Sequence, residues 1–157
     1  MVYSIIGQSG SGKTTMGKKL HKFLTTERRN WRKDVFHIDE DTLRLINGNT
    51  NFTETGIRNN IRDAYFLAEY LHVAGCDVVI SIMSPYVELR EVLKDNIGPD
   101  IQEVFLHTSD TERGTKKYKV PNFEHPEINF IDIDTTKKSP ERSFSKLITN
   151  LNKLDKL

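Results

Sequence analysis

Residues 2–15 read VYSIIGQSGSGKTT, a short apolar run followed directly by a glycine-rich loop that ends in Lys-Thr-Thr. Gly7, Gly12, Lys13 and Thr14 match the spacing G-x-x-x-x-G-K-[ST]. In this pattern a buried strand leads into a loop whose backbone N–H groups converge on phosphate oxygens, and a helix N-terminus adds its partial positive charge. The stretch therefore predicts a phosphate-binding loop between a strand and a helix.

The rest of the chain alternates strand-like and helix-like segments. Apolar runs predict strands at 2–6, 35–38, 77–83, 103–107 and 128–133. Helical spacing predicts helices at 14–28, 57–74, 86–95 and from 139 onward. The run at 77–83, DVVISIM, suits a central strand that is buried on both faces. This alternation predicts an α/β fold, a three-layer P-loop NTPase of the nucleoside and nucleotide kinase type with a five-stranded parallel sheet.

Composition narrows the classes of protein that fit. The 157 residues suit a single kinase domain, with a basic, lid-like segment at about 108–126 that interrupts the alternation. The net charge of +1 gives no global reason to expect a nucleic-acid or membrane partner. A single cysteine cannot form an internal disulfide, no segment reaches the length of a membrane span, and the first apolar run lacks a basic leader. We therefore expect a cytoplasmic protein.

The phosphate loop predicts the residues that bind the phosphoryl donor. Its glycines allow backbone angles that other residues avoid, Lys13 can reach the β- and γ-phosphates, and the Thr14 hydroxyl can ligate Mg²⁺ or one of its waters. We expect ATP as donor and Mg²⁺ as metal. Arg113, in the basic segment, is equally well interpreted as a phosphate-neutralising residue or as part of a solvated loop. The candidate ATP-binding residues are Gly7, Ser9, Gly10, Ser11, Gly12, Lys13, Thr14, Thr15 and Arg113.

A second group of candidates follows the second predicted strand, in the stretch HIDEDTLR at 37–44. A carboxylate at this strand end can hold the waters of Mg²⁺ or take a proton from an acceptor hydroxyl. We favour Asp39 as the base, with Asp41 as a second catalytic residue or as the N-cap of a following helix. His37 is more simply explained as a packed side chain.

These segments together resemble the adenylylsulfate kinase (APS kinase) family over most of the chain. GQSGSGKTT is similar to the family's phosphate loop, and IDEDTLR to its Asp-Gly-Asp-x-x-Arg segment, with Glu40 in place of glycine. Phe52, the triplet at 60–62, the segment IMSPY at 82–86 and DTTKKSPERS at 134–143 also resemble family segments. The resemblance implies an ATP- and Mg²⁺-dependent phosphotransferase that acts on the 3′-hydroxyl of adenosine 5′-phosphosulfate (APS).

The same resemblance implies the acceptor side of the site. The residues that it implicates in acceptor binding are Asp39, Arg44, Phe52, Arg58, Asn60 and Ser84. Ser84 matches a serine that the family phosphorylates, which adds it to the catalytic candidates Lys13, Asp39 and Asp41. A structural role for Ser84, ending a strand and capping the next helix, is the alternative.

Three departures from the family bear on the acceptor. An ungapped alignment puts Ile57 at the position where the family has an acceptor-binding arginine. Arg58 is one position later, which on a helix turns its side chain by about 100°, and a local shift of the helix could bring Arg58 back to the arginine's position. Val87 replaces another arginine. The segment after 107 is shortened and lacks the family's Phe-Thr-Gly loop, so that Lys116, Lys117, Lys119, Tyr118 and Phe123 are left as its charged and aromatic candidates.

The departures leave three hypotheses. The first is APS phosphorylation; the second is a kinase with another acceptor, such as a nucleoside, a nucleotide or a modified base in nucleic acid; the third is a nucleotide-binding module with little transfer activity. A small-molecule nucleotide is the expected partner, and a homodimer is suggested by the family.

Overall fold

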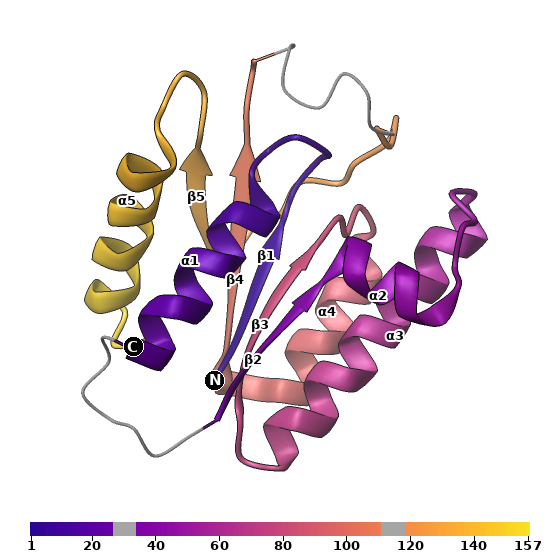
Figure 1. Ribbon diagram of the computed structural model, residues 1–157, viewed down its shortest axis with the longest axis horizontal. Helices are drawn as coiled ribbons and strands as arrows, with labels where there is room; N and C mark the ends of the chain where they lie inside the picture. The colour runs from indigo at the N-terminus through magenta and orange to yellow at the C-terminus, as the bar shows by residue number, and fades with distance from the viewer. Residues whose placement is uncertain (27–33, 111–118) are drawn as a thin grey trace.

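The computed structural model describes residues 1–26, 34–110 and 119–157 and forms a parallel sheet covered by helices (Figure 1). The strands run in the order β2-β3-β1-β4-β5, and each neighbouring pair is parallel. They are β1 (Val2–Ile6), β2 (Val35–Asp39), β3 (Asp77–Ile82), β4 (Ile101–His107) and β5 (Phe130–Asp134). The helices are α1 (Lys13–Thr26), α2 (Glu40–Asn47), α3 (Glu54–Val73), α4 (Val87–Ile97) and α5 (Pro140–Lys153), with a 3-10 turn at Gly98–Asp100. The predicted five-stranded parallel sheet is confirmed.

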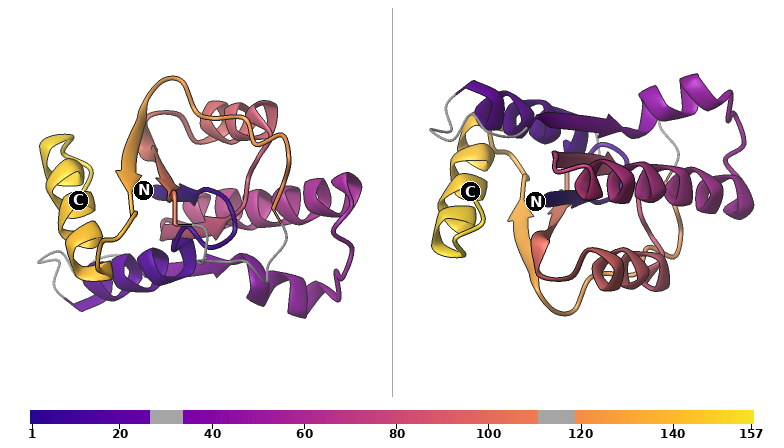
Figure 2. Two further views of the ribbon diagram at one scale, coloured as in Figure 1. Left: turned by 90° about the horizontal axis from the view of Figure 1, so that it is seen from above. Right: turned by 90° about the horizontal axis from the view of Figure 1, so that it is seen from below.

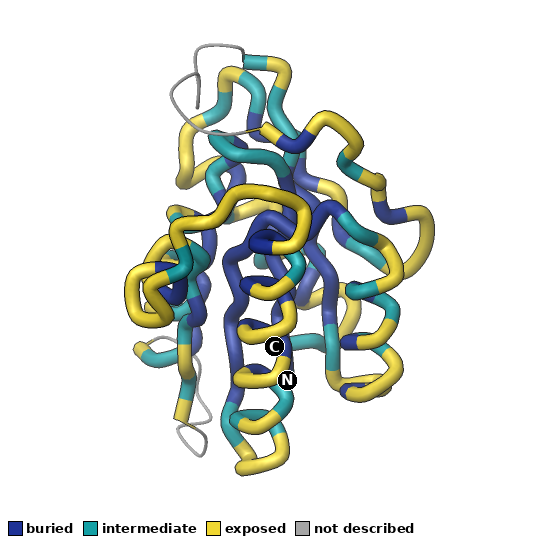
Figure 3. The backbone as a smooth tube through the Cα atoms, turned by 90° about the vertical axis from the view of Figure 1, so that its right-hand side faces the viewer, coloured by how far each residue is buried: buried dark blue, intermediate teal, exposed yellow. Residues whose placement is uncertain are grey.

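Two apolar clusters hold the helices against the two faces of the sheet (Figure 2). Residues such as Ile61 of α3 and Leu93 of α4 pack on one face, and Leu20 of α1 and Leu147 of α5 pack on the other. The central strands β1 and β3 are buried along their whole length, as the apolar run at 77–83 predicts (Figure 3). Because all strands are parallel, their carboxyl ends meet at one edge, where the phosphate loop lies.

Some element boundaries differ from the predicted ones. The helix α3 begins at Glu54, one turn before the predicted start, because Thr53 caps it through a polar first turn that the apolar pattern does not reveal. Strand β5 begins at Phe130 rather than 128, since Asn129 takes a left-handed φ of 53° and Ile128 stays exposed. The predicted end of the first helix lies outside the described residues.

The helix that follows β2 also corrects one prediction. Asp39, not Asp41, is the N-cap of α2: its side chain accepts a hydrogen bond from the Thr42 N–H, and Asp41 lies in the first turn. Either aspartate satisfies the sequence preference for an N-cap, and the end of the strand at Asp39 decides between them. Among the described helices, none is both long and apolar enough to span a bilayer.

Candidate active site

The phosphate loop joins β1 to α1 in a conformation that needs glycine. Gly7, Gly10 and Gly12 have φ values of 145°, 84° and 99°. A Cβ on Gly7 would lie 2.1 Å from the Leu106 carbonyl oxygen, so a side chain there would push β1 and β4 apart. The Ser11 hydroxyl is buried and has no hydrogen-bond partner within the described residues. An unsatisfied hydroxyl inside the loop fits a site that receives phosphate oxygens.

Lys13 is held by contacts of its side chain and of its backbone. Its Nζ donates a hydrogen bond to the Gln8 carbonyl oxygen at 2.9 Å, and the residue is only 9% exposed. The Lys13 carbonyl oxygen accepts a hydrogen bond from the Ser81 hydroxyl on β3 at 3.1 Å. Lys13 is therefore anchored at both ends: its ammonium is bonded within the loop, and its backbone is bonded to the sheet.

His37 contributes to this anchoring rather than to the chemistry. Its Nε2 lies 2.9 Å from the Ser81 hydroxyl, and burial lowers its pKa. Gly17 of α1 passes so closely that a Cβ there would lie 2.0 Å from the Ser81 Oγ and 2.4 Å from the His37 Nε2. His37 is a packed side chain, as expected.

The second strand brings a carboxylate against the loop. Thr14 Oγ1 donates a hydrogen bond to Asp39 Oδ2 at 2.7 Å, and the other carboxylate oxygen of Asp39 faces Thr42. The predicted metal-binding hydroxyl and one predicted catalytic carboxylate are thus in contact. Asp41 is exposed on the first turn of α2. The donor side of the site is therefore assembled from β1, α1 and the end of β2.

Glu40, which the sequence marks only as a departure from a glycine, is a partly buried residue beside the predicted site. Its Oε2 accepts a hydrogen bond from the Met83 N–H at 2.7 Å, and its Oε1 lies 3.5 Å from Arg44 Nε. Desolvation raises the pKa of this carboxyl, against the opposing effects of the Met83 N–H and of Lys13. The contact joins residues 43 apart in the chain, so no local pattern indicates it.

The acceptor candidates on α2 and α3 are largely buried. Arg44 is 6% exposed, donates to the Asn51 carbonyl oxygen at 3.1 Å, and lies over the Phe52 ring with its Cζ 4.5 Å from the centroid. Phe52 keeps 48% of its surface exposed. The Asn60 amide is 1% exposed, and neither of its polar atoms has a hydrogen-bond partner in the described part of the chain. Buried amides without a hydrogen-bond partner are rare, which keeps Asn60 a candidate for contact with a ligand.

Ser84 is the most enclosed of these candidates. It is fully buried, its hydroxyl accepts a hydrogen bond from the Tyr65 hydroxyl at 2.9 Å, and its carbonyl oxygen accepts one from Arg90 Nη1 at 2.8 Å. Burial raises the pKa of Tyr65 to about 12, so Tyr65 stays a donor at neutral pH. Ser84 does not cap α4: the N-cap is Tyr86, which makes no side-chain cap bond. Phosphorylation of Ser84 would require this buried network to open.

Arg90 is itself held by a buried ion pair. Its Nε lies 3.1 Å from Glu103 Oε1, with both side chains 1% exposed, and Lys94 Nζ lies 2.8 Å from the other oxygen. We expect Arg90→Met to lower the free energy of unfolding by about 3–5 kcal/mol, because it leaves Glu103 buried with one cation fewer. Urea denaturation measures this. Lys19→Met, which breaks the surface pair with Glu141, is the matched control and should cost less than about 1 kcal/mol.

Ile57 and Arg58 lie at and next to the position of the family's acceptor-binding arginine. Ile57 is 1% exposed and packs in the core beneath α3. Arg58 stacks on the Tyr86 ring at 3.9 Å from its centroid and pairs with Glu54 and Glu88. The hydrogen bond to Glu88 is the main cause that raises the pKa of Arg58. The structure thus places Arg58 beside the segment that carries Ser84, with its guanidinium already engaged by two carboxylates.

Sequence reasoning missed a cavity of about 260 Å³ next to the phosphate loop. One wall is the loop and α1, and the other is the turn after β5 with the start of α5. Its lining residues are Gly10, Ser11, Gly12, Thr15, Met16, Lys19, Thr135, Lys138, Pro140 and Ser143. The buried Ser143 hydroxyl has no hydrogen-bond partner among the residues described. In the sequence, the wall formed by the turn after β5 and the start of α5 is indicated only by the resemblance of residues 134–143 to a family segment.

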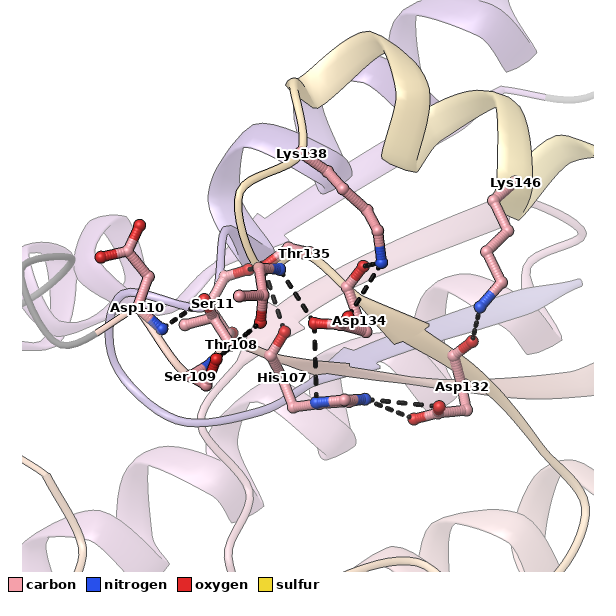
Figure 4. A network of polar contacts seen from close by, with 11 residues as sticks. Ser11, His107, Thr108, Ser109, Asp110, Asp132, Asp134, Thr135, Lys138 and Lys146 are labelled. Carbon is pink, nitrogen blue, oxygen red and sulfur yellow. Dashed lines mark hydrogen bonds and ion pairs between the residues drawn. The ribbon is translucent and has the colours of Figure 1, made fainter.

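A network of polar contacts fixes that second wall (Figure 4). The Thr135 hydroxyl lies 3.1 Å from both the Ser11 and the His107 carbonyl oxygens, which ties the turn to the phosphate loop. Asp134 bonds Lys138 at 2.9 Å, and its hydrogen bonds to Thr136 and Lys138 hold its pKa well below its usual range. The turn is therefore a fixed wall of the cavity.

The basic segment is only partly described. Arg113, Lys116, Lys117 and Tyr118 lie outside the described residues, so their predicted roles stay predictions. Lys119 is exposed, and Phe123 packs against Phe105 with ring centroids 5.8 Å apart.

A glycine loop that presents Lys13 and Thr14, with the carboxylate at the end of β2 bonded to Thr14, is typical of the P-loop nucleotide-binding enzymes, which include many kinases. Within that class the chain belongs to the adenylylsulphate kinase family, whose model matches residues 1–120. It is an ATP-dependent phosphotransferase that acts on a hydroxyl group.

Individual relatives agree with this assignment. The chain is 28% identical to the adenylyl-sulfate kinase of Pseudomonas aeruginosa, over 94% of this chain and 83% of that one. It is 30% identical to a probable adenylyl-sulfate kinase of Synechocystis, over 96% and 85% of the two chains. The Mycobacterium tuberculosis APS kinase CysC in complex with AMPPNP and APS has a TM-score of 0.77 at 20% identity, covering 96% of both chains, and confirms the fold. A gluconokinase of Sinorhizobium meliloti also shares the fold, with a TM-score of 0.71 at 19% identity over 98% of this chain and 92% of the other.

Proposed function

We propose that the protein transfers the γ-phosphoryl group of ATP to the 3′-hydroxyl of APS. The observation that carries the proposal is the contact between Thr14 and Asp39, because it joins the donor loop to the strand end from which the acceptor candidates begin. Arg44 follows on α2, with Phe52 and Asn60 beyond it. The relatives named adenylyl-sulfate kinase, and the M. tuberculosis enzyme whose structure holds APS, support this choice of acceptor.

The residues present fit the donor and its metal. The loop N–H groups and Lys13 would surround the phosphates, and the cavity between Thr15 and Ser143 would take the nucleoside. Thr14 and Asp39 would hold Mg²⁺, which when bound neutralises charge on the β- and γ-phosphate oxygens. The loop and Lys13 thus keep positive charge in place for the transition state.

The acceptor proton needs a carboxylate, and two candidates remain. Asp39 already accepts the Thr14 hydroxyl bond, which supports a role on the metal side. Asp41 lies two residues further along the chain, is exposed and is not the N-cap of α2, which makes it the alternative base. We retain Asp39 as the first candidate and test the two together.

Glu40 adds a pH-dependent contribution to stability. Desolvation raises its carboxyl pKa above the ordinary value for glutamate in the folded protein, so the folded state binds the proton more tightly than the unfolded one. Stability then falls as pH rises from about 4.5 through the folded pKa. We expect Glu40→Gln, which keeps an acceptor for the Met83 N–H, to raise the melting temperature relative to wild type at pH 8, with the gain shrinking toward pH 5. Scanning calorimetry across this range checks it, and a pH-independent difference would be the contrary result.

A second candidate function is phosphorylation of another hydroxyl acceptor. The chain lacks the Phe-Thr-Gly segment that the family uses for the purine of the acceptor, and Phe123 is engaged with Phe105. Acceptor-dependent ADP release, measured with APS, nucleosides, nucleotides and oligonucleotides, separates the two. Turnover on APS at about 1–100 s⁻¹ supports the first function, and turnover only on another acceptor supports the second.

The homodimer and the cytoplasmic location remain predictions. The hexameric APS kinase of Thiobacillus denitrificans, which shares the fold at a TM-score of 0.76 and 19% identity over 100% of this chain and 30% of the other, shows that a related fold can assemble. On α3, Phe66, Tyr70 and Val73 are exposed at helical spacing, which supports a subunit contact on that helix.

A further inference from the structure

Residues 120–124, called the strap below, lie between the donor loop and the segment that carries Ser84. Figure 1 draws this part of the chain in orange, returning across the carboxyl ends of the strands toward β5. Hydrogen bonds fix the strap at both ends, and an aromatic contact fixes its middle. The strap is thus attached to the phosphate loop at one end and to the segment that carries Ser84 at the other.

The donor end of the strap is bonded to the phosphate loop by Gln8. The Gln8 side chain donates from Nε2 to the Val120 carbonyl oxygen at 2.6 Å and accepts the Val120 N–H on Oε1 at 3.2 Å. Val120 is 7% exposed and belongs to the apolar core. The Gln8 carbonyl oxygen also holds Lys13 Nζ at 2.9 Å. One residue of the loop therefore contacts both the strap and the loop's lysine.

The acceptor end of the strap is bonded beside Ser84 by Glu124. The Glu124 N–H donates to the Pro85 carbonyl oxygen at 2.9 Å, and its carboxylate accepts the Val87 N–H. Val87 is the first residue of α4, whose N-cap Tyr86 makes no side-chain cap hydrogen bond, so Glu124 caps the helix from outside it. A carboxylate is favoured there by the helix dipole.

The middle of the strap reaches Ser84 by a second route. The Phe123 ring lies 6.0 Å from Arg90 Cζ, and Arg90 donates to the Ser84 carbonyl oxygen at 2.8 Å. Two independent sets of contacts thus connect the strap to the backbone at 84–87.

We propose that the strap couples the donor loop to the acceptor segment at 84–87, with Gln8 and Glu124 as positioning residues. Phosphates seated in the loop fix the backbone of Gln8, Gln8 fixes the strap, and the strap fixes the backbone around Ser84. Ligand binding that orders a shared element lowers the ordering cost for a second ligand, and the coupling is reciprocal. Nucleotide and acceptor therefore bind cooperatively. The proposal rests on ATP binding to the loop, and on the proposed function only for the identity of the acceptor.

Hydrogen exchange of the Ser84, Tyr86 and Val87 amides tests the coupling without an acceptor. Exchange is measured by mass spectrometry with and without saturating Mg²⁺-AMPPNP, whose occupancy is confirmed by calorimetry for each variant. In the wild type, nucleotide should slow exchange at these amides by about 5–150-fold. Gln8→Ala should bring this ratio close to one, whereas Asn150→Ala, which removes an amide-to-carbonyl bond on α5, should leave it unchanged. A wild type without the effect, or a Gln8→Ala variant that keeps it, overturns the proposal.

Variants at the other end distinguish positioning from general destabilisation. Glu124→Ala removes the acceptor for the Val87 N–H, and Glu124→Gln keeps an oxygen in its place. We expect the alanine variant to lose the nucleotide effect on exchange and the glutamine variant to retain most of it. Equal behaviour of the two contradicts a role for the cap.

The same coupling should appear in acceptor affinity. Calorimetric titration of APS with and without AMPPNP should show tighter binding in the presence of nucleotide, and Gln8→Ala should bring the two affinities together. If wild-type protein binds no APS in either condition, the proposed acceptor is wrong, and the exchange experiment still decides the strap. If APS binds equally well with and without nucleotide, the strap proposal fails alone.

Discussion

Lys13→Ala is expected to lower kcat/KM for phosphoryl transfer by at least about 10³-fold while the protein stays folded. Lys13 is nearly buried, and its ammonium is already positioned by the Gln8 carbonyl oxygen. A preorganised cation stabilises charge on the transferring group without reorganisation during the reaction, and alanine replaces it with nothing.

Acceptor-dependent ADP release and a thermal melt measure the two parts of this prediction. Lys22→Ala is the control, because Lys22 is an exposed lysine on the same helix. Activity of Lys13→Ala within tenfold of wild type would contradict the assignment of the phosphate loop.

Asp39→Asn is expected to reduce kcat by about 10²–10⁴-fold. Asparagine keeps the size of the side chain and an oxygen for the Thr42 N–H, but it cannot take a proton and holds no charge next to Thr14. Both roles considered for Asp39, as base and as a ligand of metal-bound water, require the carboxylate.

Asp41→Asn measured beside it separates those roles. If Asp39 is the base, Asp39→Asn lowers kcat at every Mg²⁺ concentration, and Asp41→Asn has a small effect. If Asp39 instead binds Mg²⁺ or its waters, Asp39→Asn needs a higher Mg²⁺ concentration for half-maximal rate. In that case Asp41 is the base, and Asp41→Asn shows the large loss of kcat. Losses below tenfold in both variants would exclude the two carboxylates from the chemistry.

The parts of the fold that can be predicted from the sequence are those marked by a pattern of neighbouring residues. The loop spacing, the apolar runs of β1 and β3 and the helical stripe of α3 each lie within a few residues, and all three elements are present. The errors are local ambiguities: two aspartates suit the N-cap of α2, and the first turn of α3 is polar. At β5 the apolar Ile128 extends the predicted strand, but the left-handed Asn129 ends it.

The parts of the site that escaped prediction join distant segments. Gln8 and Val120 are 112 residues apart, and Glu40 and Met83 are 43 apart. Burial of Glu40 depends on how α2 packs against the end of β3, and the cavity wall at Lys138 depends on how the turn after β5 meets the loop. Such contacts follow from the assembled sheet, and single-sequence patterns do not encode them.

The most direct test of the proposed reaction follows the phosphoryl group itself. Wild-type protein is mixed with Mg²⁺, APS and ATP labelled in the γ-phosphoryl group, and the products are identified by mass spectrometry. We predict that the label appears on the 3′-oxygen of APS, with one ADP formed for each labelled product. Label released as inorganic phosphate, with unmodified APS remaining, would contradict the proposed function.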